Sequence, residues 1–440
     1  MSLRRSLSAR PDLLAMHRRA PARWPFFLDS ASRGGSLGRW SILMRTNPAS
    51  PALQIGHEGI GSFLPMLESD WNRFKAPQAG QLPFEGGWFI YLGYEFAAEI
   101  EPKLNLPPSG DDLPVAFAQR CDGAVLVDHE RLEAWAVAES DSLLHVIVAE
   151  AAEYGLPMAA STAYLEPRLA AEDGAGFIDG VRRIRQYIAD GDVFQTNLSR
   201  AWHGTADSPI DAATVYQSLA DRNAAPFAGL ARLPGGTLVS SSPERLISSR
   251  DGWVEARPIA GTRPRGASPE QDRALSSELL DHPKERAEHI MLIDLERNDL
   301  GRVCRPGSVE VDELMVLESY AHVHHIVSNV RGRLRAEVTP ADVIRAAFPG
   351  GTITGCPKVR CMQIIAELES SGRSFYTGSM GYLGLNGSMD LNILIRSMLV
   401  SGNQLWFRTG AGIVADSEPH AELAETEDKA RGLLRALSRA

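Results

Sequence analysis

The stretch Phe348-Pro-Gly-Gly-Thr-Ile-Thr-Gly-Cys-Pro-Lys-Val-Arg360 is the most informative part of this sequence. Its small residues end at Thr354 and Gly355, and Pro357 stands where a helix would begin. Glycine lets a backbone approach a ligand closely, and proline suits the first turn of a helix. The start of a helix also leaves unpaired N–H groups and a partial positive charge. The stretch therefore predicts a loop-to-helix junction that can bind a carboxylate or phosphate.

Helical and strand patterns alternate along the rest of the chain without a regular βαβ rhythm. Apolar residues from Phe177 to Ile188 recur at helical spacing, and the Asn386-Gly387 pair predicts a hairpin. Further helices are expected at residues 141–153, 284–292, after Pro357 and at 420–437, and strands at 26–28, 40–43, 84–95, 193–198, 389–400 and 405–409. This pattern predicts an α+β fold with large antiparallel sheets.

Local composition divides the chain into three segments. Residues 1–23 are rich in arginine and poor in acids, which predicts a frayed basic N-terminus, with a transit peptide as the alternative. Residues 24–165 are expected to form an N-terminal region, with strands and turns from 24 to about 135 and a helix at 141–153, and residues 170–437 a second region. The Ala/Pro/Glu-rich stretch 156–175 between them is the predicted linker.

The overall composition narrows the class of protein. With 440 residues, 44% of them apolar and 23% charged, the chain can form a large core. The net charge of −10 disfavours nucleic acid as a partner, because proteins that bind it are usually basic. No apolar run approaches the roughly 20 residues of a membrane helix, and none of the cysteines forms a CxxC pair. We therefore expect a cytoplasmic protein without a membrane partner.

Two predicted helices each contain a pair of glutamates three residues apart. Glu285 and Glu288 form one pair, and Glu422 and Glu425 form the other. Residues at this spacing share a helix face, and most such pairs are simply solvated. Two acidic helices that face one cleft would instead make a site for Mg²⁺, which prefers oxygen ligands. The spacing alone leaves both interpretations open.

Together with the 348–360 stretch, these pairs resemble motifs of the chorismate-utilising enzymes. Ser241-Ser-Pro-Glu-Arg245 and Arg408-Thr-Gly-Ala-Gly-Ile413 are similar to further motifs of that family, and the resemblance extends from about residue 84 to residue 429. It implies two interleaved subdomains with large antiparallel β-sheets flanked by helices. It also implies chorismate as the substrate, with residues 170–437 as the chorismate-binding catalytic region.

The resemblance implies Mg²⁺ as the cofactor. In the family, glutamates at these positions hold Mg²⁺ against the ring carboxylate of chorismate. Glu288 and Glu425 match the nearer ligands. Glu285 and Glu422 would act directly or through water.

The resemblance also implies roles for individual residues. Glu244 falls at the position of the general acid that protonates the departing C4 hydroxyl, and burial would raise its pKa for that task. From the residues alone, a turn glutamate paired with Arg245 is the alternative. Arg408 and Gly412 would bind the enolpyruvyl carboxylate, for which an arginine fork is well suited. The other residues expected around the substrate are Thr262, His325, Thr354, Gly355, Ala411 and Lys429.

Members of the family differ in the nucleophile that they use. Isochorismate and salicylate synthases use water with a lysine as its base, and the matching residue here is the uncharged Gln195. This favours an ammonia user. Glu296, Asn392 and the Gly350-Gly351 pair resemble aminodeoxychorismate synthase component I. Ala260 argues against this subfamily, because many aminodeoxychorismate synthases have a lysine there that attacks C2, whereas anthranilate synthases have alanine.

The reaction we expect converts chorismate and ammonia to 4-amino-4-deoxychorismate, a precursor of 4-aminobenzoate and folate. Anthranilate synthase component I is the alternative. The chain has no Gly-x-Cys-x-Gly motif, so a separate glutamine amidotransferase subunit is expected to supply the ammonia. A non-catalytic relative that senses tryptophan is a remote alternative, which the presence of Glu244, Glu288 and Glu425 disfavours.

A second group of residues resembles the tryptophan pocket found in both ammonia-using subfamilies. Phe27-Leu-Asp-Ser30, followed by Gly38-Arg-Trp-Ser41, is similar to its first half, and Asn223-Ala-Ala-Pro-Phe227 to its second. Simple core strands and turns are the alternative. The residues that would bind tryptophan are Ser30, Arg39, Asn223, Pro226 and Phe227.

Overall fold

A computed structural model describes residues 2–32, 37–47, 49–76, 80–158, 167–319 and 323–437. The helices are α1 Leu13–Arg19, η1 His57–Gly59, α2 Phe63–Phe74, η2 Tyr94–Phe96, α3 Ala97–Ile100, α4 Asp141–Tyr154, α5 Gly174–Ala189, α6 Ala212–Arg222, α7 Pro269–Asp281, α8 Pro283–Gly301, α9 Pro340–Ala347, α10 Lys358–Leu368 and α11 Pro419–Leu437. The strands are β1 Leu3–Ser6, β2 Phe26–Asp29, β3 Trp40–Thr46, β4 Leu53–Ile55, β5 Gly87–Leu92, β6 Ala116–Asp128, β7 Glu133–Ala138, β8 Arg168–Ala171, β9 Gln195–Thr205, β10 Phe227–Leu233, β11 Gly236–Ser242, β12 Arg245–Arg250, β13 Trp253–Ala256, β14 Ile259–Pro264, β15 Glu310–Ser319, β16 Val323–Arg333, β17 Gly355–Cys356, β18 Ser379–Gly384, β19 Met389–Asn392, β20 Ser397–Ser401 and β21 Gln404–Ile413.

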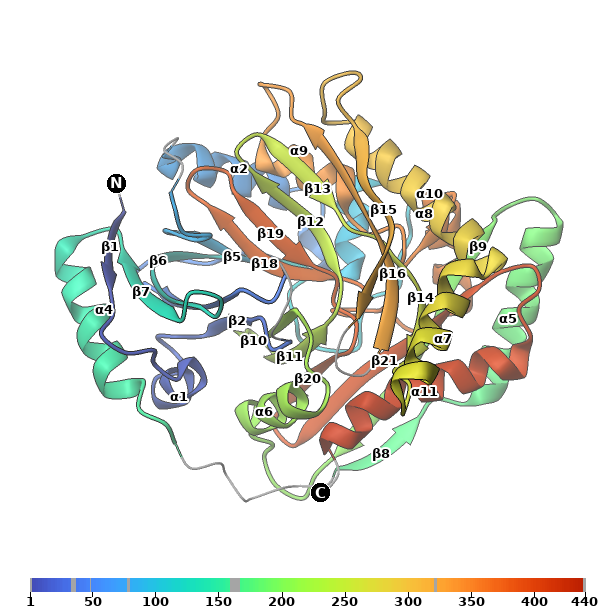
Figure 1. Ribbon diagram of the computed structural model, residues 1–440, viewed down its shortest axis with the longest axis horizontal. Helices are drawn as coiled ribbons and strands as arrows, with labels where there is room; N and C mark the ends of the chain where they lie inside the picture. The colour runs from blue at the N-terminus through green and yellow to red at the C-terminus, as the bar shows by residue number, and fades with distance from the viewer. Residues whose placement is uncertain are drawn as a thin grey trace.

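Antiparallel strands form the centre of the molecule, and helices cover its outside (Figure 1). Two pairings join the N-terminal region to the rest of the chain. Strand β2 pairs with β10, and β5 pairs with β18, so that Ile90 lies opposite Gly381. The α+β fold with interleaved parts and large antiparallel sheets, predicted from the sequence, is confirmed.

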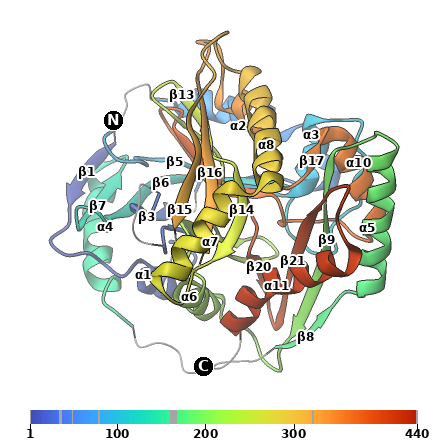
Figure 2. The ribbon, with the colours of Figure 1, turned by 45° about the vertical axis from the view of Figure 1, so that its right-hand side comes forward.

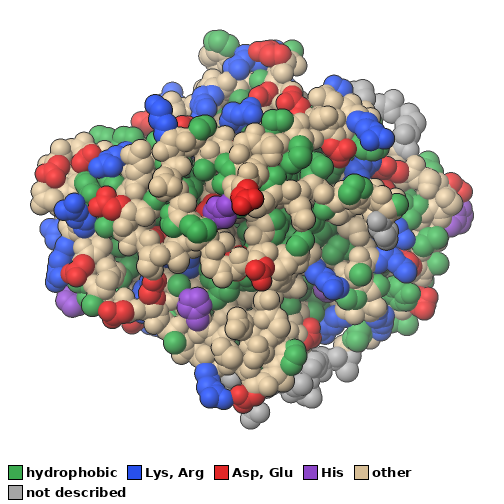
Figure 3. Space-filling model, turned by 180° about the vertical axis from the view of Figure 1, so that it is seen from behind, with side chains coloured by type: hydrophobic (Ala, Val, Ile, Leu, Met, Phe, Trp, Pro, Cys, Tyr) green, Lys and Arg blue, Asp and Glu red, His purple; other side chains and the backbone are tan. Residues whose placement is uncertain are grey.

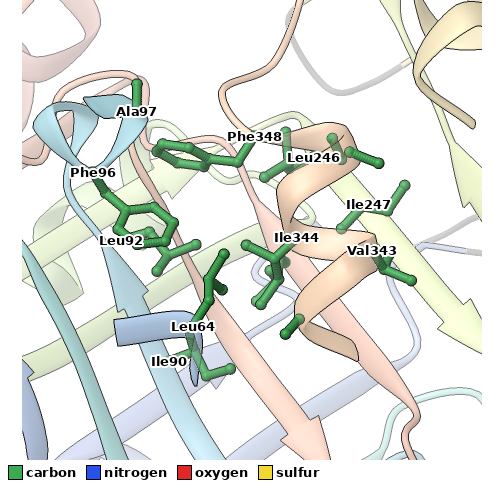
Figure 4. Packing of buried hydrophobic residues seen from close by; sticks show 14 of the residues in the cluster. Leu64, Ile90, Leu92, Phe96, Ala97, Leu246, Ile247, Val343, Ile344 and Phe348 are labelled. Carbon is green, nitrogen blue, oxygen red and sulfur yellow. The ribbon is translucent and has the colours of Figure 1, made fainter. Parts of the chain in front are cut away.

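One hydrophobic cluster shows how closely the two parts interleave (Figure 4). Leu64 of α2 and Ile90 of β5 pack against Ile344 of α9. The rings of Phe96 and Phe348 meet edge to face, with their centroids 5.5 Å apart. Phe348 is the first residue of the stretch that we quoted from the sequence, so this core anchors the loop that follows it.

The expectation of a frayed N-terminus over residues 1–23 is wrong for the part that the structure describes. Strand β1 pairs with β7, and α1 buries Leu13, Leu14 and Met16 in the core. The Asp12 carboxylate caps α1 by accepting a hydrogen bond of 2.9 Å from the Ala15 amide. The arginines dominated the composition, while a few apolar residues on one helix face determined the structure.

The predicted linker, residues 156–175, is ordered in part. Residues 159–166 lie outside the described residues. Strand β8 pairs with the edge of β9, and Asp173 caps α5 through the amide of Ala175 at 3.2 Å. The region from 24 to about 135 also contains α2, which the expectation of strands and turns missed.

The predicted single strand over residues 389–400 is broken into β19 and β20. The break lies at residues 393–396, and Arg396 has a φ of 50°. Strand β19 pairs with β12 and β18, whereas β20 pairs with β11 and β21. The chain therefore changes partners at the break, and the positive φ turns Arg396 out of the strand direction.

The loop-to-helix junction is confirmed at the start of α10, with Pro357 as its N-cap residue. Gly355 has a φ of +129°, and a Cβ there would lie 2.1 Å from the Gln195 carbonyl oxygen. Only glycine fits such a close approach. Among the described residues, no helix is long and apolar enough to cross a membrane.

Candidate active site

Glu244 lies in the turn between β11 and β12, with a side chain that is 6% exposed. The Thr352 hydroxyl donates a hydrogen bond of 2.7 Å to Glu244 Oε1. Burial raises the pKa of Glu244 to about 7, although Thr352 and the charges of Arg396 and Lys429 oppose this shift. Such a carboxyl can hold a proton near neutral pH and donate it.

The alternative interpretation of Glu244, a turn glutamate paired with its neighbour, is wrong. Arg245 makes a bidentate ion pair with Asp390 of β19, at 2.9 Å for each hydrogen bond. The turn is fixed instead by the Ser242 hydroxyl, which donates to the Ile393 carbonyl at 2.5 Å. The Ile393 amide donates to the Glu244 carbonyl at 3.0 Å. Glu244 is thus held against the break between β19 and β20.

Thr262 and His325 lie opposite each other on the paired strands β14 and β16. The Thr262 hydroxyl and His325 Nδ1 are 2.9 Å apart. Burial, and then the charge of Arg396, lowers the pKa of His325 to about 4, so the ring is neutral at physiological pH. The expected contact of His325 with substrate stays a prediction. Ala260, two residues before Thr262 on β14, is 9% exposed.

Gln195 begins β9, where the 348–355 loop and β21 converge. Strand β9 pairs with β17 on one side and β21 on the other. A Cβ at Gly412 would lie 2.5 Å from Gln195 Nε2, so the amide of Gln195 covers that glycine. Thr354 and Ala411 are fully buried beside it, and the Thr354 hydroxyl donates to the Gly350 carbonyl at 2.9 Å. The structure therefore brings these predicted residues together.

Lys429 links α11 to the same strands. Its ammonium group donates to the Gly410 carbonyl at 2.9 Å and pairs with Glu425 at 2.8 Å. Its charge also acts on Glu244. In Figure 2, α11 lies below strands β20 and β21, and α8 lies above them.

The guanidinium of Arg408, which was expected to bind a substrate carboxylate, is held by other groups of the protein. Its side chain is 1% exposed and pairs with Glu369 at 3.2 Å. It also donates to the hydroxyls of Ser199 at 3.0 Å and Ser371 at 3.2 Å. Glu369 in turn pairs with Arg373 at 2.6 Å. Arg408 is thus part of a buried network that joins β21 to α10 and the chain after it.

Arg396 is the cation that the sequence analysis missed. Burial lowers the pKa of Arg396, and the charge of Glu244 opposes this effect. Its charge also acts on His325 and lowers the pKa of that ring. Arg396 was missed because the pattern of residues 389–400 predicted one continuous strand, in which Arg396 would be an ordinary surface position.

The four predicted metal ligands flank the site without forming a cluster. Glu285 of α8 pairs with Arg263 at 3.1 Å and lies against Gly261, whose Cβ would be 2.9 Å from Glu285 Oε2. Glu425 of α11 pairs with Lys429. Over the described ranges, no group of three or more His, Cys, Asp or Glu side chains is placed to hold a metal ion. Carboxylates are ligands that Mg²⁺ prefers, and Glu285 and Glu425 are here held by Arg263 and Lys429. The other two predicted ligands are Glu288 on α8 and Glu422 on α11, and the role of all four stays a prediction.

A cavity of about 130 Å³ contains four of the five predicted tryptophan-binding residues, Ser30, Arg39, Pro226 and Phe227. Arg39 pairs with Asp128 at 2.7 Å and stacks on Trp40. Asn223 does not line this cavity. Its carbonyl accepts a hydrogen bond from Ser241, and its side chain faces Gly432. The prediction of a ligand in this cavity stays a prediction.

The three sequence features that pointed to one subfamily lie in different places. Asn392 lines the 130 Å³ cavity, donates to the Phe227 carbonyl at 3.1 Å and lies opposite Arg245 in the β12–β19 pairing. A Cβ at Gly350 would meet only the ends of flexible side chains, Ile393 Cδ1 at 2.9 Å and Leu246 Cδ1 at 3.3 Å. Glu296 of α8 is buried, and the charge of Glu244 is one of the causes that raise its pKa.

Comparison with known proteins agrees with this fold. The model of the family described as chorismate binding enzyme matches residues 51–435. The chain belongs to this family of enzymes.

Similar proteins carry two names. An "Anthranilate synthase component I-like protein" of Synechocystis sp. (strain ATCC 27184 / PCC 6803 / Kazusa) is 45% identical, covering 91% of this chain and 83% of that protein. Aminodeoxychorismate synthase component 1 of Bacillus subtilis (strain 168) is 41% identical over 80% of this chain and 77% of its own. The crystal structure of anthranilate synthase component I from Streptococcus pneumoniae TIGR4 superposes with a TM-score of 0.80 and 30% identity, over 90% of this chain and 92% of that one. These names leave the product open.

Proposed function

We propose that this chain is the synthase component of an aminodeoxychorismate synthase. It converts chorismate and ammonia to 4-amino-4-deoxychorismate and water. The observation that supports this most is the buried Glu244, whose pKa is raised to about 7 and on which the charges of Arg396 and Lys429 act. A carboxylic acid near two cations suits an anionic substrate with a hydroxyl leaving group.

Each residue of the site has its own role in the proposed reaction. Glu244 gives its proton to the C4 hydroxyl, which leaves as water. Arg396 offers a planar guanidinium to a substrate carboxylate, a role that we had assigned to Arg408. Neutral His325 and Thr262 provide hydrogen bonds without adding charge. Gln195 has no basic group, so the nucleophile arrives as ammonia and needs no lysine to deprotonate it.

Mg²⁺ is part of the proposal. Bound between α8 and α11, it would neutralise a carboxylate of the substrate and fix its orientation. Glu288 and Glu425 would be the nearer ligands, with Glu285 and Glu422 behind them. Loading would require Glu425 to release Lys429 and Glu285 to release Arg263, the two ion pairs seen here.

A glutamine amidotransferase subunit is the proposed source of ammonia. The word component in the names of the relatives implies a second subunit. Ammonium dominates over ammonia at neutral pH, so a partner that releases ammonia beside the site would raise its local concentration. The isolated chain should work with ammonium salts at alkaline pH, and with glutamine only after the amidotransferase is added.

Anthranilate synthase component I is the second candidate, and two observations favour it. Ala260 stands where a covalent mechanism would need a lysine. The cavity lined by Ser30, Arg39, Pro226 and Phe227 is the predicted tryptophan site. Inhibition by tryptophan suits an enzyme of tryptophan biosynthesis better than an enzyme of another pathway. Glu296, on α8, is the observation that favours aminodeoxychorismate synthase.

Product identification tests the proposal. The purified chain is incubated with chorismate, Mg²⁺ and ammonium chloride, and the products are separated by chromatography. We expect 4-amino-4-deoxychorismate, which an added aminodeoxychorismate lyase converts to 4-aminobenzoate. Fluorescent anthranilate as the sole product would replace the first candidate with the second, and unchanged chorismate would contradict both.

A further inference from the structure

Strand β12 contains a bulge directly beside the proposed acid. Arg245, which follows Glu244, lies opposite Asn392 of β19, and the register of the two strands shifts between Arg245 and Ile247. Leu246 is therefore an extra residue of β12, and the ladder of backbone hydrogen bonds is interrupted there. Successive residues of a regular strand point to opposite faces, whereas Leu246 and Ile247 both pack in the hydrophobic cluster of Figure 4.

An ion pair spans this bulge. The Arg245 guanidinium donates two hydrogen bonds of 2.9 Å, one to each carboxylate oxygen of Asp390. Asp390 lies opposite Ser248, so the side chain of Arg245 reaches from one side of the bulge to the other. The two side chains of the pair are 15% and 25% exposed, and the guanidinium lies over the Phe227 ring, 5.1 Å from its centroid. Two parallel hydrogen bonds fix the orientation of the partners as well as their distance.

The backbone of Glu244 has a second attachment to the chain that continues from β19. Its carbonyl accepts a hydrogen bond of 3.0 Å from the Ile393 amide. Its amide donates at 3.2 Å to the Ser242 hydroxyl, which itself donates to the Ile393 carbonyl at 2.5 Å. Glu244 is therefore held between two attachments, one through Ile393 and one through the Arg245–Asp390 pair. Without the ion pair, the start of β12 could turn about the attachment that remains.

We propose that Arg245 and Asp390 are positioning residues for Glu244, because their ion pair holds the start of β12 across the bulge and so fixes the direction of the Glu244 carboxyl. The inference rests on the proposed function, in which Glu244 gives its proton to the departing hydroxyl. Both side chains of the pair line the 130 Å³ cavity, so neither is expected to contact the substrate. Displacement of a reacting group by about 1 Å can slow a reaction about 10²-fold.

Arg245→Ala tests this role by comparing turnover with substrate binding. We expect kcat with ammonium to fall on the order of 10²-fold, while the Kd for chorismate, measured by calorimetry, stays within a few fold of wild type. The removed side chain also leaves space beside the cavity, into which a small cation can diffuse. Guanidinium chloride on the order of 10 mM, far below the concentrations that unfold proteins, should therefore raise kcat of the variant several fold. Urea, a neutral molecule of similar shape, and sodium chloride should not.

Matched variants separate positioning from a loss of stability. Arg120 of β6 donates to both carboxylate oxygens of Glu139, at 2.5 and 2.7 Å, and these two side chains are 8% and 29% exposed. Arg120→Ala should lower Tm, because Glu139 loses its partner, but should leave kcat unchanged with and without guanidinium. The double variant Arg245→Ala/Asp390→Ala should be as slow as Arg245→Ala, because the pair acts as a unit. Guanidinium should not restore its activity, since the carboxylate partner is gone.

Three results would overturn the positioning role: an unchanged kcat in Arg245→Ala, no recovery with guanidinium, or a Kd for chorismate that rises as much as kcat falls. If Arg245→Ala does not fold, Arg245→Lys decides, since lysine keeps the charge but cannot form two parallel hydrogen bonds. Its kcat should be lowered at an unchanged Kd, and a wild-type kcat would contradict the proposal. Normal activity of Glu244→Gln would instead contradict the proposed acid, whereas an inactive Glu244→Gln with a normal Arg245→Ala would contradict the positioning role alone.

Discussion

At the scale of the residue, burial determines the protonation states of Glu244 and His325 more than ion pairing does. Glu244 and His325 are both buried near Arg396, and both are shifted toward their neutral forms. The result is a protonated acid and a neutral hydrogen-bonding ring beside a cation. Neither state follows from residue type, because an exposed glutamate would be ionised at neutral pH.

The raised pKa of Glu244 predicts a pH dependence of activity. The acid form is required, so kcat/KM for chorismate should fall as pH rises through about 7. The measurement must hold the concentration of free ammonia constant, because ammonia itself increases with pH. A kcat/KM that stays level from pH 6 to pH 9 would show that the acid is another group.

The same shift predicts a pH dependence of stability. A carboxyl whose pKa is higher in the folded protein favours folding below its unfolded value of about 4.5, and this contribution is lost as pH rises to about 7. Glu244→Gln removes the buried charge, so the Tm of the variant should rise relative to wild type at pH 8 and match it at pH 4. Thermal scans at both values check this. A difference in Tm that is the same at both pH values would contradict it.

At the scale of the element, the break between β19 and β20 and the ends of α8 and α11 build the site. The break presents Arg396, and the turn between β11 and β12 presents Glu244 against it. Apolar residues at helical spacing predicted α5 and α10, and helices were also expected within α4, α8 and α11, although α8 continues to Gly301, beyond the expected end at residue 292. The break was not predictable, since an apolar run with one arginine looks the same in a continuous strand.

The two arginines should respond differently to replacement. Arg396→Lys should raise KM for chorismate about 10-fold, in line with the loss of a bidentate contact, while the fold is unaffected. Arg408→Met should instead lower the free energy of unfolding by about 3–5 kcal/mol, because Glu369 loses a partner in a buried network. Steady-state kinetics and denaturant unfolding separate the two effects. The reverse pattern would restore Arg408 as the substrate ligand.

The glutamate pairs on α8 and α11 predict Mg²⁺ binding that depends on substrate. Chorismate should increase the affinity of the protein for Mg²⁺, since part of the coordination shell comes from the substrate. Calorimetric titration with and without chorismate measures this, and Glu288→Gln or Glu425→Gln should abolish the increase without changing Tm. Full turnover in EDTA would contradict the role of the metal.

At the scale of the whole molecule, the N-terminal region and the C-terminal region form one interleaved structure. The β2–β10 and β5–β18 pairings and the cluster in Figure 4 connect them. On the face seen in Figure 3, acidic and basic side chains are intermingled, with hydrophobic patches between them. The sequence motifs predicted the fold class, but the N-terminal helix was missed, because seven residues give too short a pattern.

The N-terminal helix predicts a cost for its removal from the core. Leu14 of α1 is 7% exposed and packs in a cluster with residues of both regions. Leu14→Ala should therefore lower the free energy of unfolding by about 2–5 kcal/mol, as for other buried leucines. Leu3→Ala, at an exposed position of β1, is the control and should change little. Equal stability of the two variants would mean that α1 is not part of the core in solution.

The central claim is that Glu244 is the acid of a chorismate site, and Glu244→Gln tests it most directly. Binding of chorismate to the variant is measured by calorimetry and turnover with ammonium by product formation. We predict a Kd within a few fold of wild type and a kcat lowered by 10²–10⁴-fold, the range for a positioned general acid. A variant that binds chorismate and turns it over at the wild-type rate would contradict the claim.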